Sequence, residues 1–145
     1  MTTPAVPGRL YLIDTSAFAR INHDPVRAII AGLIVDRAAA TCITVDVEAG
    51  YSGRDETDVL AIANRRRSQY VVLPINETIA DRAREVQRRM AARGLHRAVG
   101  VVDMLTAAVA EYHGAVVLHY DADFEHIAAA TGQPQVWVAA RGSLP

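Results

Sequence analysis

The chain has 145 residues, of which 51% are hydrophobic, and its formal net charge is −1. This length and composition suit one globular domain with its own core, and the charge gives no overall attraction to nucleic acid. All fifteen basic residues are arginine, which excludes P-loop nucleotide hydrolases, Schiff-base enzymes and phosphoaspartyl phosphatases, because each of them uses a lysine in its site.

Strand and helix patterns alternate along the chain. An apolar run at 10–13 predicts the first strand, and a short helical segment at 15–20 follows it. Asp24 followed by Pro25 is typical of an N-cap and a first-turn proline, for a helix that runs to about Arg37. The other predicted strands are 41–43, 70–73, 115–118 and 135–138. The other predicted helices are a short one capped by Thr44, then 55–68, 77–93, 101–113 and 124–131.

Strands separated by helices predict βαβ units, and therefore an α/β fold with a largely parallel sheet covered by helices on both faces. We find no linker, internal repeat or low-complexity tract, so one domain is expected over residues 1–145. In sheets of this kind, functional sites form beyond the carboxyl ends of the strands.

The cysteine content, the first residues and the lengths of the apolar segments bear on the compartment of the protein. Cys42 is the only cysteine, which excludes an internal disulfide and a thiolate metal cluster. Residues 1–8 lack the charged start and apolar core of a signal peptide. No segment approaches the roughly 20 apolar residues that a membrane helix needs. These features predict a cytoplasmic protein without a membrane segment.

Four acids follow predicted strands or begin predicted helices: Asp14, Glu48, Asp103 and Asp121. Each has an ordinary explanation when it is taken alone. Asp14 could be a helix cap, Asp103 could interact with a helix dipole, and Glu48 could be a solvated side chain. Burying an unpaired carboxylate costs free energy, however, and four acids that converge at one edge of a sheet are explained by a hard divalent metal among them.

The order and spacing of these acids, with the residues around them, resemble the PIN-domain ribonucleases, and most closely the VapC-type toxins of bacterial toxin–antitoxin pairs. Glu48 falls where that family carries its acid after the second strand. His119 departs from the pattern, because the family usually has Thr or Ser two residues before the fourth acid. His119 could alter the hydrogen bonds of Asp121, or it could donate to the scissile phosphate. The matching segments are Leu10-Tyr11-Leu12-Ile13-Asp14-Thr15-Ser16, Val102-Asp103-Met104-Leu105-Thr106-Ala107-Ala108 and Asp121-Ala122-Asp123-Phe124.

The resemblance implies a PIN-like three-layer α/β/α sandwich and a Mg²⁺- or Mn²⁺-dependent endoribonuclease toxin. Carboxylate oxygens are the ligands that these ions prefer, and such a metal activates water and neutralises charge on a phosphate. The resemblance implies that the catalytic residues and metal ligands are Asp14, Glu48, Asp103 and Asp121. The residues expected around them are Thr15, Ser16, Asp123 and His119.

The resemblance also implies folded RNA such as tRNA or rRNA as the substrate, with a cognate VapB-type antitoxin that blocks the site. A toxin homodimer and a toxin–antitoxin hetero-oligomer are expected. Arginine suits phosphate recognition, so RNA contacts are predicted at Arg82, Arg89, Arg93 and Arg97. Alternatively, these arginines lie on a solvated helix face and form ion pairs with nearby acids. The apolar side chains proposed either for antitoxin contact or for the core are Val26, Ile29, Ile30 and Leu33.

Two other functions stay open at this point. The chain could be a catalytically silent PIN-like module that binds RNA or protein, or a metal-dependent phosphatase acting on small molecules. Cleavage of RNA with Mg²⁺ or Mn²⁺, with EDTA and Asp14→Asn as controls, separates these alternatives.

Overall fold

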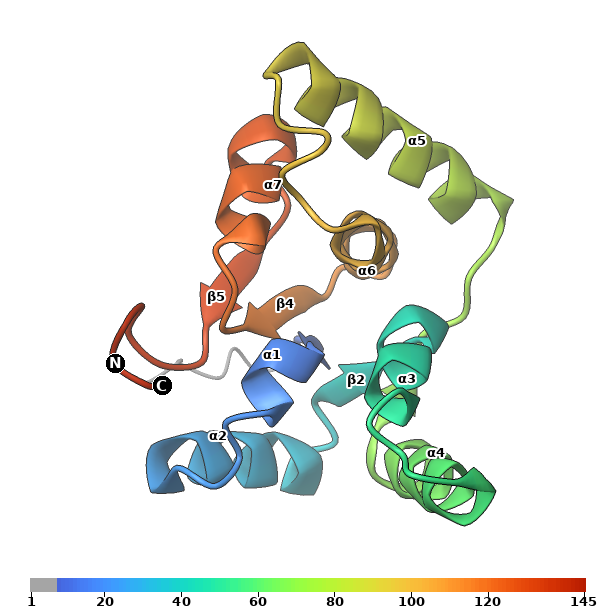
Figure 1. Ribbon diagram of the computed structural model, residues 1–145, viewed down its shortest axis with the longest axis vertical. Coiled ribbons are helices and arrows are strands. Elements are labelled where there is room, and N and C mark those ends of the chain that lie inside the picture. The colour runs from blue at the N-terminus through green and yellow to red at the C-terminus, as the bar shows by residue number, and fades with distance from the viewer. Residues whose placement is uncertain (1–7) are drawn as a thin grey trace.

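A computed structural model describes residues 8–145, and within them five strands form one sheet in the order β3-β2-β1-β4-β5 (Figure 1). Every pairing between neighbouring strands is parallel, which confirms the predicted α/β fold. β1 is central, so the loop after it lies in the middle of the carboxyl edge of the sheet. The strands are β1 Tyr11–Ile13, β2 Ala39–Thr41, β3 Val71–Val72, β4 Val116–His119 and β5 Gln135–Trp137.

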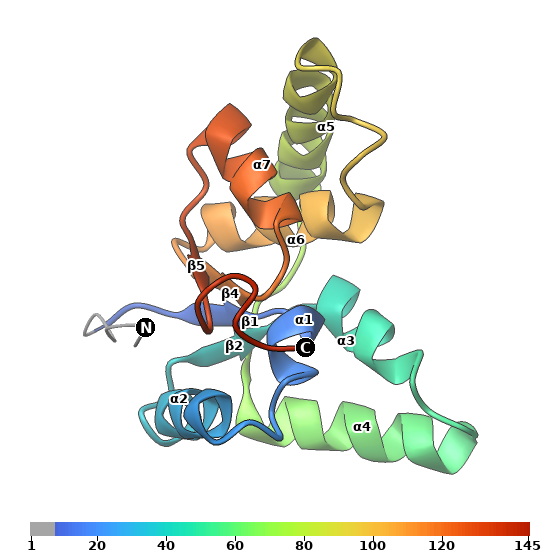
Figure 2. The same cartoon turned by 60° about the vertical axis from the view of Figure 1, so that its left-hand side comes forward.

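Helices cover both faces of this sheet. In Figure 2, α5, α6 and α7 lie on one side, α2 and α4 lie on the other, and α1 and α3 lie between the two groups. None of the helices formed by residues 8–145 is both long and apolar enough to cross a membrane. The helices are α1 Thr15–Phe18, α2 Asp24–Val35, α3 Ile43–Gly50, α4 Glu56–Gln69, α5 Glu77–Ala92, α6 Val101–Tyr112 and α7 Asp123–Thr131.

The central strand contributes to two hydrophobic clusters, one on each face of the sheet. Leu12 packs with residues of α5, α6 and α7, whereas Tyr11 and Ile13 pack with residues of α2. Successive side chains of a strand point to opposite faces, so a strand covered on both sides is apolar throughout. This explains why β1 is a continuous apolar run directly before an acid.

The α2 side chains proposed for antitoxin contact belong to the core. Val26, Ile30 and Leu33 are 0%, 1% and 4% exposed and pack in the cluster beneath β1. Of the two alternatives, antitoxin contact or core, the structure supports the core for these three residues. The cap of α2 also differs from the prediction, because His23 is the N-cap and Asp24 is the first helical residue.

The second strand and the helix after it begin earlier than predicted. β2 ends at Thr41, Cys42 is the extended N-cap of α3, and Ile43 is already helical. Thr44 lies inside α3 and hydrogen-bonds the Thr106 hydroxyl instead of capping the helix. The β-branched Ile43 resembles a strand residue in sequence, but its side chain is 55% exposed on α3.

Burial on α6 does not follow a single stripe. Met104, Ala107 and Ala110 are buried, whereas Val101 and Tyr112, at the two ends of the helix, are 66% and 50% exposed. α6 is in contact with α3, α5, α7 and β4. A stripe assumes one covered face, and here neighbours surround most of the helix.

Candidate metal centre

The sheet register brings the first and fourth predicted acids to the same edge. Ile13 of β1 pairs with Leu118 of β4, and the Asp14 N–H donates to the Leu118 carbonyl at 3.0 Å. The carboxyl ends of β1 and β4 are therefore side by side, and the loops carrying Asp14 and Asp121 leave the sheet together. This neighbouring position follows from the strand order, which separates β1 and β4 by about 100 residues of chain.

Asp14 is both a helix cap and a buried member of the site. Its Oδ2 accepts the Ser16 N–H at 3.0 Å and the Ser16 hydroxyl at 2.5 Å. The Ser16 oxygen in turn accepts the Tyr120 N–H at 2.9 Å, which joins the loop after β4 to α1. Asp14 is 2% exposed, and its Oδ1 has no hydrogen-bond partner among residues 8–145.

The environment of Asp14 disfavours its charge. Burial raises the pKa of its carboxyl, the Ser16 hydrogen bonds oppose that shift, and the charges of Glu48 and Asp121 add to it. A buried, unpaired carboxylate oxygen costs free energy unless a cation or another donor reaches it.

Three further acids converge beside this edge. One oxygen each from Asp103, Asp121 and Asp123 lies within 4.8 Å of the others. Asp103 is in the first turn of α6, Asp121 is in the loop after β4, and Asp123 is the first residue of α7. Asp121 Oδ1 accepts the Asp123 N–H at 2.9 Å, which holds these two carboxylates in one turn.

The sequence interpretation placed Asp123 at a cap or around the site, and the structure places it within the cluster itself. The N-cap of α7 is Ala122, and the Asp123 Oδ2 accepts the Gly100 N–H at 3.1 Å across the cluster. A Cβ at Gly100 would lie only 3.2 Å from Asp103 Oδ2. The glycine therefore lets the start of α6 come close to both acids.

The surroundings of Asp103 strongly raise the pKa of its carboxyl. Burial, followed by the charge of Asp14, the hydrogen bond with Asp123 and the charges of Asp121 and Asp123, raises the pKa of its carboxyl to about 8. At neutral pH without a cation, Asp103 therefore holds a proton next to Asp123. Crowded carboxylates of this kind, with one unpaired buried oxygen nearby, fit a hard divalent cation that accepts oxygen ligands.

Glu48 lies apart from the three clustered acids. It projects from α3, and its Oε1 accepts the hydroxyl hydrogen of Thr15, the residue directly after Asp14. Glu48 also lines a cleft of about 420 Å³ between α1, α3 and α4, with Phe18, Arg65 and Tyr70 among its other lining residues. Thr15 thus connects Glu48 to the loop of Asp14, as expected for a residue around the site.

His119 is enclosed beneath the acids. Its side chain is 0% exposed, and its ring lies 5.0 Å from the Phe124 ring and 4.9 Å from the Trp137 ring. Nδ1 accepts the Asp121 N–H at 3.1 Å, and Nε2 lies 2.5 Å from Gln135 Oε1. Burial lowers the pKa of this ring. Both nitrogens are engaged inside the protein, so His119 does not face a bound phosphate.

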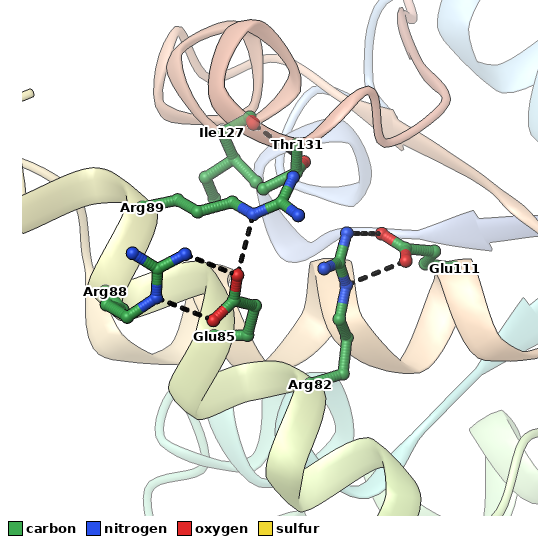
Figure 3. Close-up of polar contacts among 7 residues, drawn as sticks. All are labelled: Arg82, Glu85, Arg88, Arg89, Glu111, Ile127 and Thr131. Atoms are coloured by element: carbon green, nitrogen blue, oxygen red, sulfur yellow. Dashed lines mark hydrogen bonds and ion pairs between the residues drawn. The ribbon is translucent and has the colours of Figure 1, made fainter. Parts of the chain in front are cut away.

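Three of the four arginines predicted to contact RNA have partners within the chain, and Figure 3 shows those of Arg82 and Arg89. Arg82 pairs with Glu111 at 2.7 Å, and Arg89 pairs with Glu85 at 2.9 Å while extending toward α7. The Arg93 guanidinium donates to the Ala129 carbonyl at 2.7 Å. Arg97 is exposed in the loop that leads to Gly100.

The sequence interpretation missed a buried ion pair behind Glu48. Arg66 is 4% exposed, its Nε lies 2.7 Å from Asp46 Oδ1, and its Nη2 donates to the Thr41 hydroxyl at 3.0 Å. Thr41 also donates to Asp46 at 2.6 Å, so β2, α3 and α4 meet at one polar cluster. The run of three arginines at 65–67 could not indicate which one turns inward.

The comparison with protein families identifies the class of fold. A PIN-domain family model matches residues 11–130, a range that includes β1 to β4 and the acids Asp14, Glu48, Asp103, Asp121 and Asp123. The PIN-like sandwich expected from the sequence is confirmed by a solved chain in the DNA-bound VapBC structure from Salmonella typhimurium. That likeness has a TM-score of 0.74 at 17% identity and covers 90% of this chain and 99% of that one.

Curated relatives indicate which group of PIN-domain proteins the chain resembles. Ribonuclease VapC21 of Mycobacterium tuberculosis (strain ATCC 25618 / H37Rv) is 40% identical, with 92% of this chain and 96% of the relative covered. Ribonuclease VapC51 of the same strain is also 40% identical over the same shares. The chain belongs to the PIN-domain family and, within it, to the VapC ribonucleases.

Proposed function

We propose that this chain is a Mg²⁺- or Mn²⁺-dependent endoribonuclease that hydrolyses phosphodiester bonds of folded RNA such as tRNA or rRNA. The observation that carries the proposal is the clustering of Asp103, Asp121 and Asp123 within 4.8 Å, beside the orphaned Oδ1 of Asp14. Both curated relatives are named as ribonucleases, which supports RNA as the substrate. A small-molecule phosphatase and a silent binding module have no comparable support.

Asp14, Asp103 and Asp121 would hold the cation, with Asp123 as a further oxygen donor. A bound Mg²⁺ or Mn²⁺ would supply Lewis acidity that lowers the pKa of an attacking water and neutralises charge developing on the phosphate. Asp103 must first lose the proton that it keeps near Asp123, because a protonated carboxyl is a poor ligand for a cation.

Glu48 is assigned as a base or an additional ligand. Its bond to Thr15 holds the carboxylate on the Asp14 side of the cluster, at the edge of the cleft. A carboxylate there could accept a proton from the attacking water, which is the role of a general base. Ser16 orients Asp14 through two hydrogen bonds, so it acts on the site through that carboxylate.

The decisive experiment measures cleavage of purified tRNA and rRNA with Mg²⁺ or Mn²⁺. Because a metal site supplies several kcal/mol to the transition state, Asp14→Asn and Asp103→Asn should each lower the cleavage rate on the order of 100-fold or more. Asp36→Asn removes an exposed carboxyl at the end of α2 and should leave the rate unchanged. Cleavage that survives both EDTA and Asp14→Asn would refute the metal-dependent mechanism.

We also propose that RNA phosphates contact Arg82, Arg89, Arg93 and Arg97. Arg97 tests this most directly, because it is exposed three residues before Gly100 at the acid cluster. Arg97→Ala should weaken RNA binding for all sequences and lower the salt dependence of log affinity by about one unit, as expected for one lost phosphate contact. Arg67→Ala, an exposed position on α4, serves as the matched control. An unchanged salt slope in Arg97→Ala would contradict the contact.

The proposed partners are a cognate VapB-type antitoxin and a second copy of the chain, both met in the cytoplasm. Similar solved structures are of VapBC complexes, which supports an antitoxin. The described surface offers exposed apolar side chains next to Glu48, where a bound segment would cover the site. They are Ile43 (55% exposed), Val47 (65%) and Tyr51 (92%) on α3, which line one hollow with Glu48.

A further inference from the structure

His119 occupies a structural position that its burial alone does not explain. It is the last residue of β4, and it precedes Asp121 by two residues. The ring is fully enclosed, yet both of its nitrogens make hydrogen bonds at 2.5 Å and 3.1 Å. A buried imidazole needs partners for its nitrogens in any role, but a histidine that only filled space between Phe124 and Trp137 would not need Nδ1 to be directed at the acid loop.

The hydrogen bonds define the form of the ring. The Asp121 backbone N–H is only a donor, so Nδ1 must present a lone pair to it. The proton of the neutral ring is therefore on Nε2, which donates to Gln135 Oε1 on β5. Gln135 thus selects the form of His119 that can accept from Asp121, as the second partner of an imidazole generally does.

The contact to Asp121 has a familiar geometry. A side-chain acceptor at one residue that takes the N–H two residues later forms an Asx- or Ser/Thr-type turn. In this protein the imidazole of His119 supplies the acceptor. A second turn of the same kind follows directly, because Asp121 Oδ1 accepts the Asp123 N–H at 2.9 Å. Hydrogen bonds therefore run from Gln135 through His119 and Asp121 to Asp123.

We infer that His119 is a positioning residue: its Nδ1, with Nε2–H held by Gln135, fixes the turn that presents the Asp121 and Asp123 carboxylates to a divalent cation. The inference rests on the proposed metal-dependent cleavage and assigns a cause for the shape of that site. The competing explanation is that His119 only packs the core between Phe124 and Trp137.

Two substitutions separate these explanations. His119→Asn keeps an acceptor that can take the N–H two residues later, but it loses the ring contacts. His119→Phe keeps an aromatic ring, but it has no acceptor. Mn²⁺ affinity is measured by isothermal titration of the metal-free proteins, and the thermal unfolding midpoint is measured in parallel. His126→Phe, at an exposed position of α7, is the control for loss of an imidazole.

The positioning role predicts that His119→Phe weakens Mn²⁺ binding about 10-fold or more, in the range found when a group that orients a metal ligand is removed. His119→Asn should stay within about threefold of the wild-type affinity, although it lowers the unfolding midpoint. An affinity order that simply follows the midpoints, or wild-type affinity in His119→Phe, would overturn the inference. Absence of Mn²⁺ binding in the wild type would instead overturn the proposed function.

A second variant decides the question if His119→Phe does not fold. Gln135→Leu leaves His119 in place but removes the acceptor for Nε2–H, so the ring can move its proton to Nδ1. We expect weaker Mn²⁺ binding, and long-range ¹H–¹⁵N NMR spectra that change from the Nε2–H form to a mixture. A wild-type ring protonated at Nδ1, or unchanged Mn²⁺ affinity in Gln135→Leu, would contradict the inference.

Discussion

At the scale of single residues, Asp103 carries the largest conflict between charge and burial. It is 9% exposed and lies among other carboxylates that raise its pKa to about 8. The sequence placed an acid in the first turn of a helix, where the helix dipole favours a negative charge. The buried neighbours outweigh that small effect, so the folded protein without a cation keeps Asp103 protonated.

This pKa predicts how stability changes with pH. Between the ordinary value of 3.8 and about 8, the native state holds a proton on Asp103 that the unfolded chain has lost. The stability associated with this proton is fully present below the ordinary value and is lost as the pH rises toward 8. Asp103→Asn removes the effect, so the free energy of unfolding of the variant relative to wild type should increase from pH 5 to pH 8.

Urea unfolding in EDTA at the two pH values measures this difference. Asp36→Asn, which changes an exposed carboxyl, should retain the wild-type pH dependence. If Asp103→Asn and the wild type lose the same stability between pH 5 and pH 8, Asp103 is not the group that holds the proton.

At the scale of elements, the site is built where helices begin. Asp14 caps α1, Asp103 lies in the first turn of α6, and Asp123 begins α7. Helix N-termini offer free N–H groups and a partial positive charge, which reduces the cost of gathering carboxylates. Glu48 comes instead from the body of α3. The position of this helix depends on the ion pair between Arg66 and Asp46.

The Arg66–Asp46 pair makes a prediction about α3 and α4. Arg66→Met leaves the partly buried Asp46 charge unpaired and should lower the free energy of unfolding by up to about 3–5 kcal/mol, the range for a fully buried pair. Adding Asp46→Asn removes the unpaired charge, so the double variant should recover most of that loss. The matched control is the exposed pair Arg84–Asp81 on α5, where Arg84→Met should cost about 0–1 kcal/mol. Purely additive effects of the two core substitutions would contradict coupling between Arg66 and Asp46.

At the scale of the whole molecule, the charges and apolar groups are distributed unevenly. The net charge is only −1, because the arginines of α5 are largely balanced by Glu85, Asp81 and Glu111. The acids of the candidate centre lack such partners. Beside Glu48, three exposed apolar side chains of α3 line one hollow: Ile43, Val47 and Tyr51.

The antitoxin proposal is tested on this apolar surface. Co-expression with the product of the neighbouring reading frame should give a complex in which RNA cleavage is inhibited. Val47→Lys places a charge in the surface and should release the partner while leaving cleavage intact. Leu60→Lys, at another exposed apolar position on α4 (55%, against 65% for Val47), should not release it. Light scattering of the isolated chain then tests the proposed homodimer, and a monomeric mass would contradict it.

Local patterns predicted much of the fold. The helices expected at 55–68 and 77–93 correspond to α4 and α5. Each is capped by a neighbouring side chain, because Asp55 accepts the Asp58 N–H and Asn76 accepts the Ile79 N–H, both at 2.9 Å. The end of β2 was misjudged, because a β-branched residue such as Ile43 carries no local sign of what covers it.

The sequence by itself determined the alternation of strands and helices, the four acids at element ends, and the family to which their spacing belongs. Only the tertiary structure decided that Asp123 joins the cluster, that His119 supports Asp121 from below, and that Arg66 is the buried arginine of its run. The physical reason is that charge, burial and hydrogen-bond partners at this edge depend on β1, β4, α6 and α7. These elements are distant along the chain and meet only when the parallel sheet forms.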